Sequence, residues 1–454
     1  MGDEVQINKS FSLANRNLIV YHYIYNMKII NIVPGFGGVF YCGNCLRDSV
    51  FVKTLKTMGH DSVLLPIYLP LSNENVSNAP VFYGAVNIYL KQNFKFLRQM
   101  PGWLEHFFDS KPILRYAAKK AGSTRASGLE AMTISMLKGS EGFQKEELQV
   151  LIDFLKHHEK PDLVHLSNAL LLGLAEKIRN DLQIPVVCSL QDEDVWVDAM
   201  KPQYREQIWQ LMSAKAQYVD AFVAVSDYFA AKMKKNMQLP EDKVHVVHIG
   251  VNPDAYQVMV PSLAPPVIGY LSRICEDNGF GLLTDAFIEL KGNPSFKNVK
   301  LRLNGGMTGD DKTYINKQIK KLKQKGYLSD VEFIDAFQTE DLPAFFKGLS
   351  ALSVPVLRGE AFGLYQIEAM ASGIPVVQPT LGAFPEISEI TGGGVIYQPN
   401  TPKALAAAFG DLFANPAALN QMSVNGRKAV VNQFDSKMLT EKMIRVYEKV
   451  VRVL

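Results

Sequence analysis

The sequence predicts an α/β protein made of two parallel-sheet domains. The chain of 454 residues is longer than one ordinary hydrophobic core requires, so two domains of roughly 200 residues each are expected. Apolar segments of strand length alternate with segments of helical periodicity, which is the rhythm of βαβ units. Residues 260–266 contain three prolines and precede a new strand, which indicates a linker between the domains.

Composition narrows the class of protein. A formal net charge of +3 is close to neutral for this length, so the sequence gives no argument for a nucleic-acid partner. No apolar run approaches the roughly 20 residues of a membrane span. Four cysteines are too few for a disulfide framework and fit a reducing compartment, which favours a cytoplasmic protein.

The first domain is expected to begin at Met27. Residues 27–34, Met-Lys-Ile-Ile-Asn-Ile-Val-Pro, are typical of a first strand preceded by its own start methionine. The apolar segment before it is short, contains His22 and lacks a small-residue cleavage site, so a signal peptide is not expected. We interpret residues 1–26 as an N-terminal extension and residues 27–259 as the first domain.

Strands and helices alternate through this domain. Polar side chains follow the strands expected at residues 161–168 and 184–192. Because ligands bind at the carboxyl ends of parallel strands, we expect a site there. The other elements expected are strands at residues 29–33, 61–65, 220–226 and 244–253, with helices at 43–58 and 227–238.

A glycine-rich loop follows the first strand. Gly35, Gly37 and Gly38 lie where a backbone must approach a ligand closely. The loop is not the dinucleotide-binding fingerprint, because Phe40 stands at the place of the third glycine in Gly-x-Gly-x-x-Gly. The sequence therefore disfavours a dehydrogenase.

Cys42 and Cys45 lie at the expected start of a helix, where two interpretations are open. A helix N-terminus lowers the pKa of a thiol, which suits redox chemistry. A structural role in packing or in an acceptor loop is the favoured reading. The sequence has no second Cys-x-x-Cys or histidine pair at metal-ligand spacing, so structural zinc is not expected.

Residues 90–126 combine aromatic with basic side chains. Basic amphipathic helices with aromatic residues lie on anionic membranes, and a lipid-linked substrate would give them a reason to do so. Ordinary core residues with solvated lysines produce the same mixture, and this second interpretation is favoured. Peripheral contact with the inner face of a membrane stays open.

The second domain contains the most informative stretch, residues 350–380. An apolar strand is followed by the loop Arg358-Gly359-Glu360, by a helix that starts near Gly363, and by a new strand at residues 374–378. The helix start points free N–H groups at a ligand beyond the strands, which suits an anionic group. The other strands expected are residues 267–271, 299–304, 331–334 and 351–356.

Two glutamates flank the start of this helix. Glu360 lies in the loop, and Glu368 lies about one and a half turns inside the helix. Carboxylates beside a phosphate site accept hydrogen bonds from sugar hydroxyls, and a nucleotide sugar offers both phosphate and hydroxyls. Taken alone, such a pair is more often part of a solvated surface helix.

Three motifs close together favour a functional role for the two glutamates over a solvated surface helix. They are Glu360-Ala-Phe-Gly-Leu364, Glu368-Ala-Met-Ala-Ser-Gly-Ile-Pro-Val-Val377 and Gly382-Ala-Phe-Pro-Glu386. Together they closely resemble glycosyltransferase family four, the glycosyl transferases of group 1. The resemblance runs from about residue 27 to the end of the chain.

The resemblance implies the GT-B architecture, in which two Rossmann-like, doubly wound α/β domains face each other across a cleft. Residues 27–259 would form the acceptor-side domain and residues 267–435 the domain that binds the nucleotide sugar. Residues 436–454, which show helical spacing of apolar residues, would form a terminal helix that packs back on the first domain.

The resemblance also implies roles for individual residues. Glu360 and Arg273 would be catalytic, Glu360 by holding hydroxyls of the donor sugar and Arg273 by neutralising the diphosphate. Glu368 would hold the ribose. The backbone of Phe362, Gly363 and Leu364, with Gly37 and Gly38, would lie near the donor phosphates, Asn278 would lie on the donor side, and Gln191 and Asp192 would face the sugar or the acceptor.

Two positions depart from the family pattern. Asn278 stands where the family has a lysine, and the loss of that cation would cost roughly a few kcal/mol of transition-state stabilisation unless another group replaces it. Gln191 stands where the family often has histidine. Asp192-Glu193-Asp194 matches the Asp-x-Asp metal signature of the other large glycosyltransferase architecture, but the triplet alone is weak, and no metal is expected.

The function implied is transfer of a sugar from a nucleotide-diphosphate sugar to a hydroxyl of a glycan, a lipid-linked acceptor or a small molecule, with retention at the anomeric carbon. The departing diphosphate would act as the base, without metal or cofactor. Two alternatives remain: a nucleotide-sugar-binding protein without turnover, and another GT-B enzyme such as an epimerase or a phosphorylase.

Overall fold

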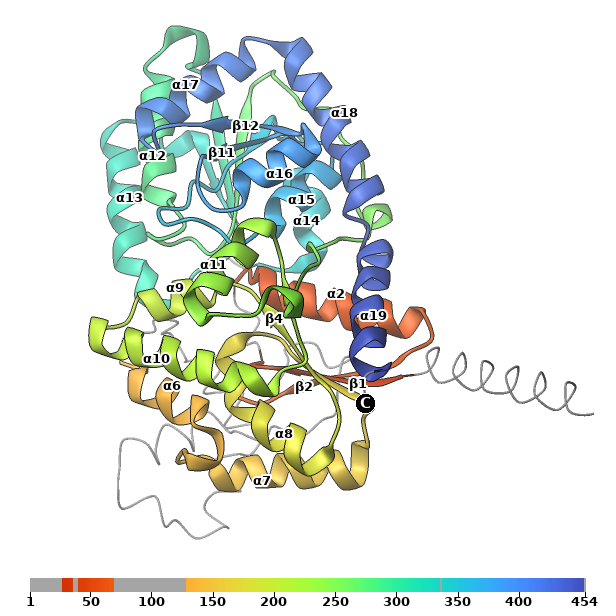
Figure 1. The fold of residues 1–454 in the computed structure, drawn as a ribbon. Helices are drawn as coiled ribbons and strands as arrows, with labels where there is room; N and C mark the ends of the chain where they lie inside the picture. The colour runs from red at the N-terminus through yellow and green to blue at the C-terminus, as the bar shows by residue number, and fades with distance from the viewer. Residues whose placement is uncertain (1–26, 36–39, 69–127, 335–336, 453–454) are drawn as a thin grey trace, which may run out of the picture.

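Two six-stranded parallel sheets form the cores of the two halves of the chain (Figure 1). The computed structural model describes residues 27–35, 40–68, 128–334 and 337–452. The expected extension at 1–26, Gly37 and Gly38, and the stretch at 90–126 in which membrane contact was considered lie outside the described residues.

The first sheet has the strand order β2-β1-β3-β4-β5-β6, and every pair in it is parallel. The order reverses between β1 and β3, which makes the sheet doubly wound. Its strands are β1 (Lys28–Val33), β2 (Asp61–Pro66), β3 (Leu163–Leu166), β4 (Val186–Leu190), β5 (Ala221–Ala224) and β6 (Val244–Val246).

The second sheet has the order β12-β11-β10-β7-β8-β9 and is also parallel throughout. Its order reverses between β7 and β10. Its strands are β7 (Val267–Leu271), β8 (Lys300–Asn304), β9 (Val331–Phe333), β10 (Ala351–Leu352), β11 (Val376–Pro379) and β12 (Gly394–Tyr397).

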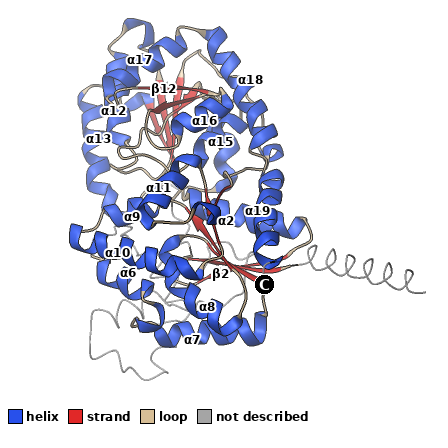
Figure 2. Cartoon of the chain, in the orientation of Figure 1, coloured by secondary structure: helices blue, strands red, loops and turns tan. Residues whose placement is uncertain are grey.

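The strands are apolar because helices cover both faces of each sheet (Figure 2). All of β4 is buried, and so are five of the six residues of β1. The predicted fold class, two doubly wound α/β domains of GT-B type, is confirmed.

Helices occupy connections between the strands, and the last three follow β12. In the first half they are α2 (Gly43–Thr57), α6 (Glu130–Leu137), α7 (Lys145–Phe154), α8 (Ala175–Leu182), α9 (Glu193–Asp198), α10 (Pro202–Lys215) and α11 (Asp227–Met237). In the second half they are α12 (Phe280–Lys291), α13 (Lys312–Gln324), α14 (Leu342–Phe346), α15 (Leu364–Ala371), α16 (Phe384–Thr391), α17 (Pro402–Phe413), α18 (Pro416–Gln433) and α19 (Ser436–Arg452). Within the described ranges, no helix is long and apolar enough to cross a membrane.

The last helix, α19, returns to the first sheet and lies beside α2 (Figure 1). Its buried face includes Leu439, Met443 and Tyr447. The Tyr447 hydroxyl lies 2.5 Å from Nδ1 of His165 on β3, and Nε2 of the same ring lies 2.8 Å from the Ser189 hydroxyl on β4. The two halves of the chain are therefore joined both by the linker and by this helix.

The two domains also touch directly at the mouth of the cleft between them. Phe40 forms an antiparallel bridge with Gly306, and the Tyr41 N–H donates to the Gly305 carbonyl over 2.7 Å. On the other side, Ser226 at the start of α11 donates from its hydroxyl to the Ala361 carbonyl over 2.7 Å. These contacts fix the segments that carry the candidate site.

A second contact at the start of α11 involves Glu386 on α16. Its carboxylate accepts the N–H groups of Asp227 and Tyr228 at 3.0 and 2.9 Å and lies 2.8 Å from Nε2 of His248. Burial raises the pKa of Glu386, but the hydrogen bonds from His248 and from the two N–H groups outweigh burial, and the net pKa is lowered. The charged carboxylate therefore caps a helix of the opposite domain.

Candidate functional site

The points at which the two strand orders reverse face the same cavity. In open parallel sheets ligands bind at such a switch point, beyond the carboxyl ends of the strands. In the second sheet β7 leads to Arg273 and β10 leads to Glu360. In the first sheet, where the order reverses between β1 and β3, the neighbouring strand β4 leads to Asp192. All three residues line a cavity of about 640 Å³ between the domains, a volume suited to a small-molecule ligand.

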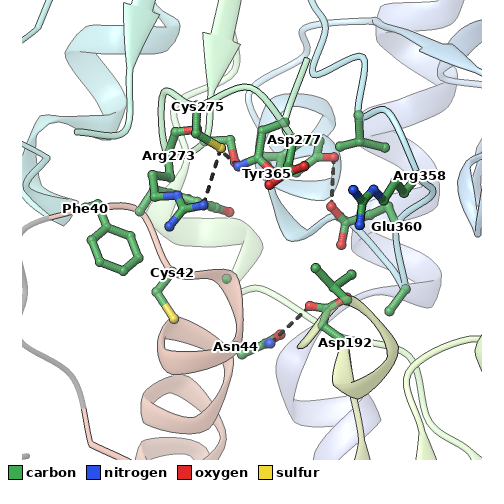
Figure 3. Close-up of a pocket in the computed structure, with 18 of the residues that line it drawn as sticks. Phe40, Cys42, Asn44, Asp192, Arg273, Cys275, Asp277, Arg358, Glu360 and Tyr365 are labelled. Atoms are coloured by element: carbon green, nitrogen blue, oxygen red, sulfur yellow. Dashed lines mark hydrogen bonds between the residues drawn. The ribbon is translucent and has the colours of Figure 1, made fainter. Parts of the chain in front are cut away.

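Glu360 lies on the second-domain side of the cavity (Figure 3). The Tyr365 hydroxyl donates to its carboxylate over 3.2 Å, and its carbonyl accepts the Ala383 N–H over 2.9 Å. Gly382 packs on the same backbone with φ +61°, where a Cβ would lie 2.3 Å from the Glu360 carbonyl oxygen. The loop is therefore fixed by close backbone packing.

Asp192 lies on the first-domain side, opposite Glu360 (Figure 3). The Asn44 amide donates to its carboxylate over 3.0 Å. Burial, and then the charge of Asp194, raise the pKa of Asp192 to about 6. Burial, and then the charge of Asp192, raise the pKa of Glu360 to about 8. The charge of Asp192 thus disfavours ionisation of Glu360.

An anion-binding element lies beside Glu360. Phe362, Gly363 and Leu364 line the cavity where α15 begins, and Gly363 adopts φ +78°. The first N–H groups of a helix have no partner within the helix, and they carry a partial positive charge. A phosphate group is a suitable ligand for this end of the cavity.

Arginine side chains add positive charge to the cavity. Arg273 lies 3.5 Å from the Cys275 sulfur and 4.0 Å from a carboxylate oxygen of Asp311, and its guanidinium lies 5.9 Å from the centre of the Phe40 ring. Arg358 is exposed and lines the same cavity, although the sequence analysis gave it no role. Its guanidinium is a candidate to replace the lysine that the family pattern would place at 278.

Asn278 also lines the cavity, but its amide group serves the local backbone. It donates to the Ser272 hydroxyl at 2.9 Å and to the Arg273 carbonyl at 3.1 Å. The neutral amide therefore supports the loop that carries Arg273 and adds no charge.

Glu368 does not line the cavity. Its side chain is 3% exposed, and each carboxylate oxygen accepts a tyrosine hydroxyl: Tyr41 at 2.7 Å and Tyr256 at 3.0 Å. Burial raises the pKa of Glu368 to about 7, against the effect of both hydrogen bonds. The residue predicted to hold ribose thus lies behind Tyr41, which does line the cavity.

Gln191 requires a correction, because the cavity is lined by its neighbour Asp192 and not by Gln191. Its buried amide accepts from the Arg47 guanidinium at 2.7 Å and donates to the Ser167 carbonyl at 2.6 Å. Arg47 also donates to the Ser189 hydroxyl at 2.6 Å. A buried guanidinium needs acceptors, so Arg47 fixes Gln191 below the floor of the site.

The acidic triplet that begins at Asp192 does not converge on one point. Glu193 is buried and accepts the N–H groups of Ala169 and Gln191 at 2.7 Å each. Asp194 forms an ion pair with Lys232. The three carboxylates thus have separate partners, and the arrangement is unlike a shared metal site.

Cys42 and Cys45, for which a structural and a redox role were both open, form a disulfide. Cys42 is the N-cap of α2, and its sulfur accepts the Cys45 N–H at 3.4 Å. Cys188 and Cys275 are free and buried. The disulfide encloses Asn44, the residue that bonds Asp192.

Two family models match the chain. Residues 140–255 match "Glycosyltransferase Family 4", and residues 259–429 match "Glycosyl transferases group 1". The chain belongs to glycosyltransferase family 4.

The chain is also similar to individual proteins in sequence or in fold. The family 4 chain is 25% identical over 304 residues to the MMP alpha-(1->4)-mannosyltransferase of Mycolicibacterium hassiacum. The matched segment covers 64% of this chain and 71% of that enzyme. Its fold is similar to that of sucrose-phosphate synthase from Thermosynechococcus elongatus, with a TM-score of 0.68, 16% identity, and coverage of 94% and 100%. It is also similar to Anabaena Alr3699/HepE in complex with UDP, with a TM-score of 0.66, 15% identity, and coverage of 93% and 100%. The two family models and the mannosyltransferase relative show that this chain is a glycosyltransferase.

Proposed function

We propose that this glycosyltransferase moves a sugar from a nucleotide-diphosphate sugar to an acceptor hydroxyl, with retention at the anomeric carbon. One observation carries the proposal: Glu360 and the N-terminus of α15 lie side by side on the cavity, opposite Asp192 of the other domain. A helix N-terminus suits phosphate, and carboxylates suit sugar hydroxyls.

The donor would lie along the second domain. Its diphosphate would contact the start of α15 and the guanidinium of Arg273, and Glu360 would accept hydroxyls of the sugar. The ribose would reach Glu368. The UDP complex of the Anabaena protein supports a nucleotide ligand in this fold.

The chemical step needs stabilisation of a leaving group. The bond between the anomeric carbon and the diphosphate oxygen breaks, and negative charge grows on that oxygen. Fixed N–H dipoles and guanidinium groups lower the energy of this charge. A diphosphate oxygen then takes the proton of the acceptor hydroxyl as the new glycosidic bond forms on the same face of the sugar.

The acceptor would enter from the first domain, where Asp192 and Trp196 line the cavity. We propose a glycan, a lipid-linked sugar or a small molecule as acceptor, and a cytoplasmic reaction. No metal takes part in this scheme, so excess chelator is expected to leave the rate unchanged. A rate restored only by added divalent cation would contradict that part of the proposal.

A nucleotide-sugar-binding protein without turnover is the second candidate. Asn278 favours this second candidate, because the family pattern has a positively charged lysine at this position and the amide of Asn278 is neutral. Slow sugar release without an acceptor, or dependence on phosphate, would instead indicate an epimerase or a phosphorylase.

The proposal is tested by calorimetric titration with UDP, GDP and ADP. The wild type is expected to bind one of them selectively. Glu368→Ala should weaken that binding, whereas Glu360→Ala should mainly lower turnover of the matching nucleotide sugar. Glu389→Ala, which removes an exposed carboxylate from α16, is the matched control and should change neither quantity. Equal behaviour of all four proteins would remove the site assignment.

A further inference from the structure

Tyr41 separates the cavity from Glu368. Its ring lines the cavity, and its hydroxyl donates to Oε2 of Glu368 over 2.7 Å. The other oxygen, Oε1, accepts from Tyr256, which does not line the cavity. A ligand in the cavity therefore meets Tyr41 before it can reach Glu368.

Tyr41 has contacts with the second domain through both its backbone and its ring. Its N–H donates to the Gly305 carbonyl over 2.7 Å, and its ring packs edge-on against Phe337 with the centroids 5.2 Å apart. The side chain is 5% exposed. Burial, and then the charge of Glu368, raise the pKa of Tyr41, so the hydroxyl keeps the proton that it donates.

We propose that Tyr41 determines nucleotide specificity: its hydroxyl occupies the ribose position on Glu368, and donor binding exchanges it for a ribose hydroxyl. This inference rests on the proposed function, because it requires a ribonucleotide donor. Tyr41 belongs to the first domain and Glu368 to the second. The exchange therefore removes one hydrogen bond between the domains when the donor binds.

Two facts support the exchange: which tyrosine a ligand in the cavity can reach, and the hydrogen bonds that the buried Glu368 carboxylate must keep. A carboxylate that is 3% exposed and covered by a tyrosine hydroxyl at each oxygen is out of reach of a ligand unless one of the tyrosines moves. Of the two tyrosines, Tyr41 is the one that the cavity reaches. A buried acceptor that loses its donor without a replacement is costly, so a ligand that displaces Tyr41 must bring a hydroxyl of its own. A ribose does so, and a 2′,3′-dideoxyribose cannot.

The test is calorimetry of the wild type, Tyr41→Phe and Tyr256→Phe. The probes are the nucleoside diphosphate that the wild type binds and its 2′,3′-dideoxy analogue. Tyr41→Phe should bind the ribonucleotide about 5- to 10-fold more tightly, because no hydroxyl has to leave Glu368. Its affinity for the dideoxy analogue should stay unchanged, since that ligand binds with residue 41 in place.

Tyr256→Phe is the matched control, because it removes a hydroxyl from the same carboxylate outside the cavity. It should produce no gain in affinity. Unchanged or weaker binding of the ribonucleotide by Tyr41→Phe would overturn the inference, and so would an equal gain for both ligands. Either result would leave the proposed function intact. Failure of every protein to bind UDP, GDP or ADP would overturn the inference together with the proposed function.

Discussion

Replacing Glu360 with glutamine should make the protein more stable at alkaline pH. Burial, and then the charge of Asp192, raise the pKa of Glu360 from the ordinary 4.5 to about 8. The folded state therefore holds a proton that the unfolded state releases between those values. The free energy of unfolding falls as pH rises through this range, and the loss is complete above the folded pKa.

The magnitude follows from the size of the shift. At about 1.4 kcal/mol per pKa unit, a change from 4.5 to about 8 corresponds to an upper limit of roughly 5 kcal/mol. The cavity is open to water, which screens the carboxylate, so we expect about 1–3 kcal/mol. Glutamine has nearly the same shape and cannot ionise. Glu360→Gln should match the wild type near pH 5 and exceed its stability by this amount above pH 8.

The assay is urea unfolding at pH 5, 7 and 8.5, followed by tryptophan fluorescence. Glu386→Gln is the control of opposite sign, because the net pKa of Glu386 is lowered and its charged form is favoured in the folded state. That variant should be less stable than the wild type at pH 7, and the gap should close as the pH falls through the range of the unfolded carboxyl. An offset for Glu360→Gln that is equal at pH 5 and 8.5, or a loss of stability at pH 8.5, would refute the reasoning.

Two further changes test the packing that supports the site. Arg47→Met should lower the free energy of unfolding by about 2–5 kcal/mol, because Gln191 and Ser189 would each lose a buried, charged hydrogen-bond donor. The assay is urea unfolding. A loss of less than about 1 kcal/mol in the free energy of unfolding would contradict this role. Gly382→Ala should cost at least about 2 kcal/mol and reduce sugar transfer, since the new Cβ would press on the Glu360 backbone. Gly326→Ala, which has a similar positive φ but open space around it, should cost only about 1 kcal/mol and leave transfer unchanged.

The segment around Glu360 shows how much of the fold local signals determine. The helix expected near Gly363 begins at Leu364, and the strand expected at residues 374–378 is observed at Val376–Pro379. Apolar runs, glycine stops and proline positions act over a few residues, so they can be found in the sequence alone. The strand expected at 351–356 is shorter, Ala351–Leu352, because the Val354 N–H donates to the Gln378 side chain over 3.1 Å and Pro355 has no N–H to donate to a ladder.

The contacts that define the site could not be found in this way. Tyr41 and Glu368 are 327 positions apart, and they meet only because the two domains pack together. The family resemblance implied that Gln191 faces the sugar or the acceptor, but buried Arg47, 144 positions earlier, takes its amide as an acceptor. No local sequence pattern indicates such distant partners. The roles expected of Gly37 and Gly38 stay predictions, since both residues lie outside the described residues.

The position of α19, which is the last helix of the chain but packs on the first domain, determines the order in which the domains of a newly made chain are completed. The strands of the first sheet leave the ribosome about 200 residues before α19 does, since β6 ends at Val246 and α19 begins at Ser436. Until then His165 lacks the Tyr447 hydroxyl, and the surface that will bury Leu439 and Met443 stays open to water. The first domain to be synthesised is thus the last to be completed, and in the interval its uncovered apolar surface is a natural target for a chaperone.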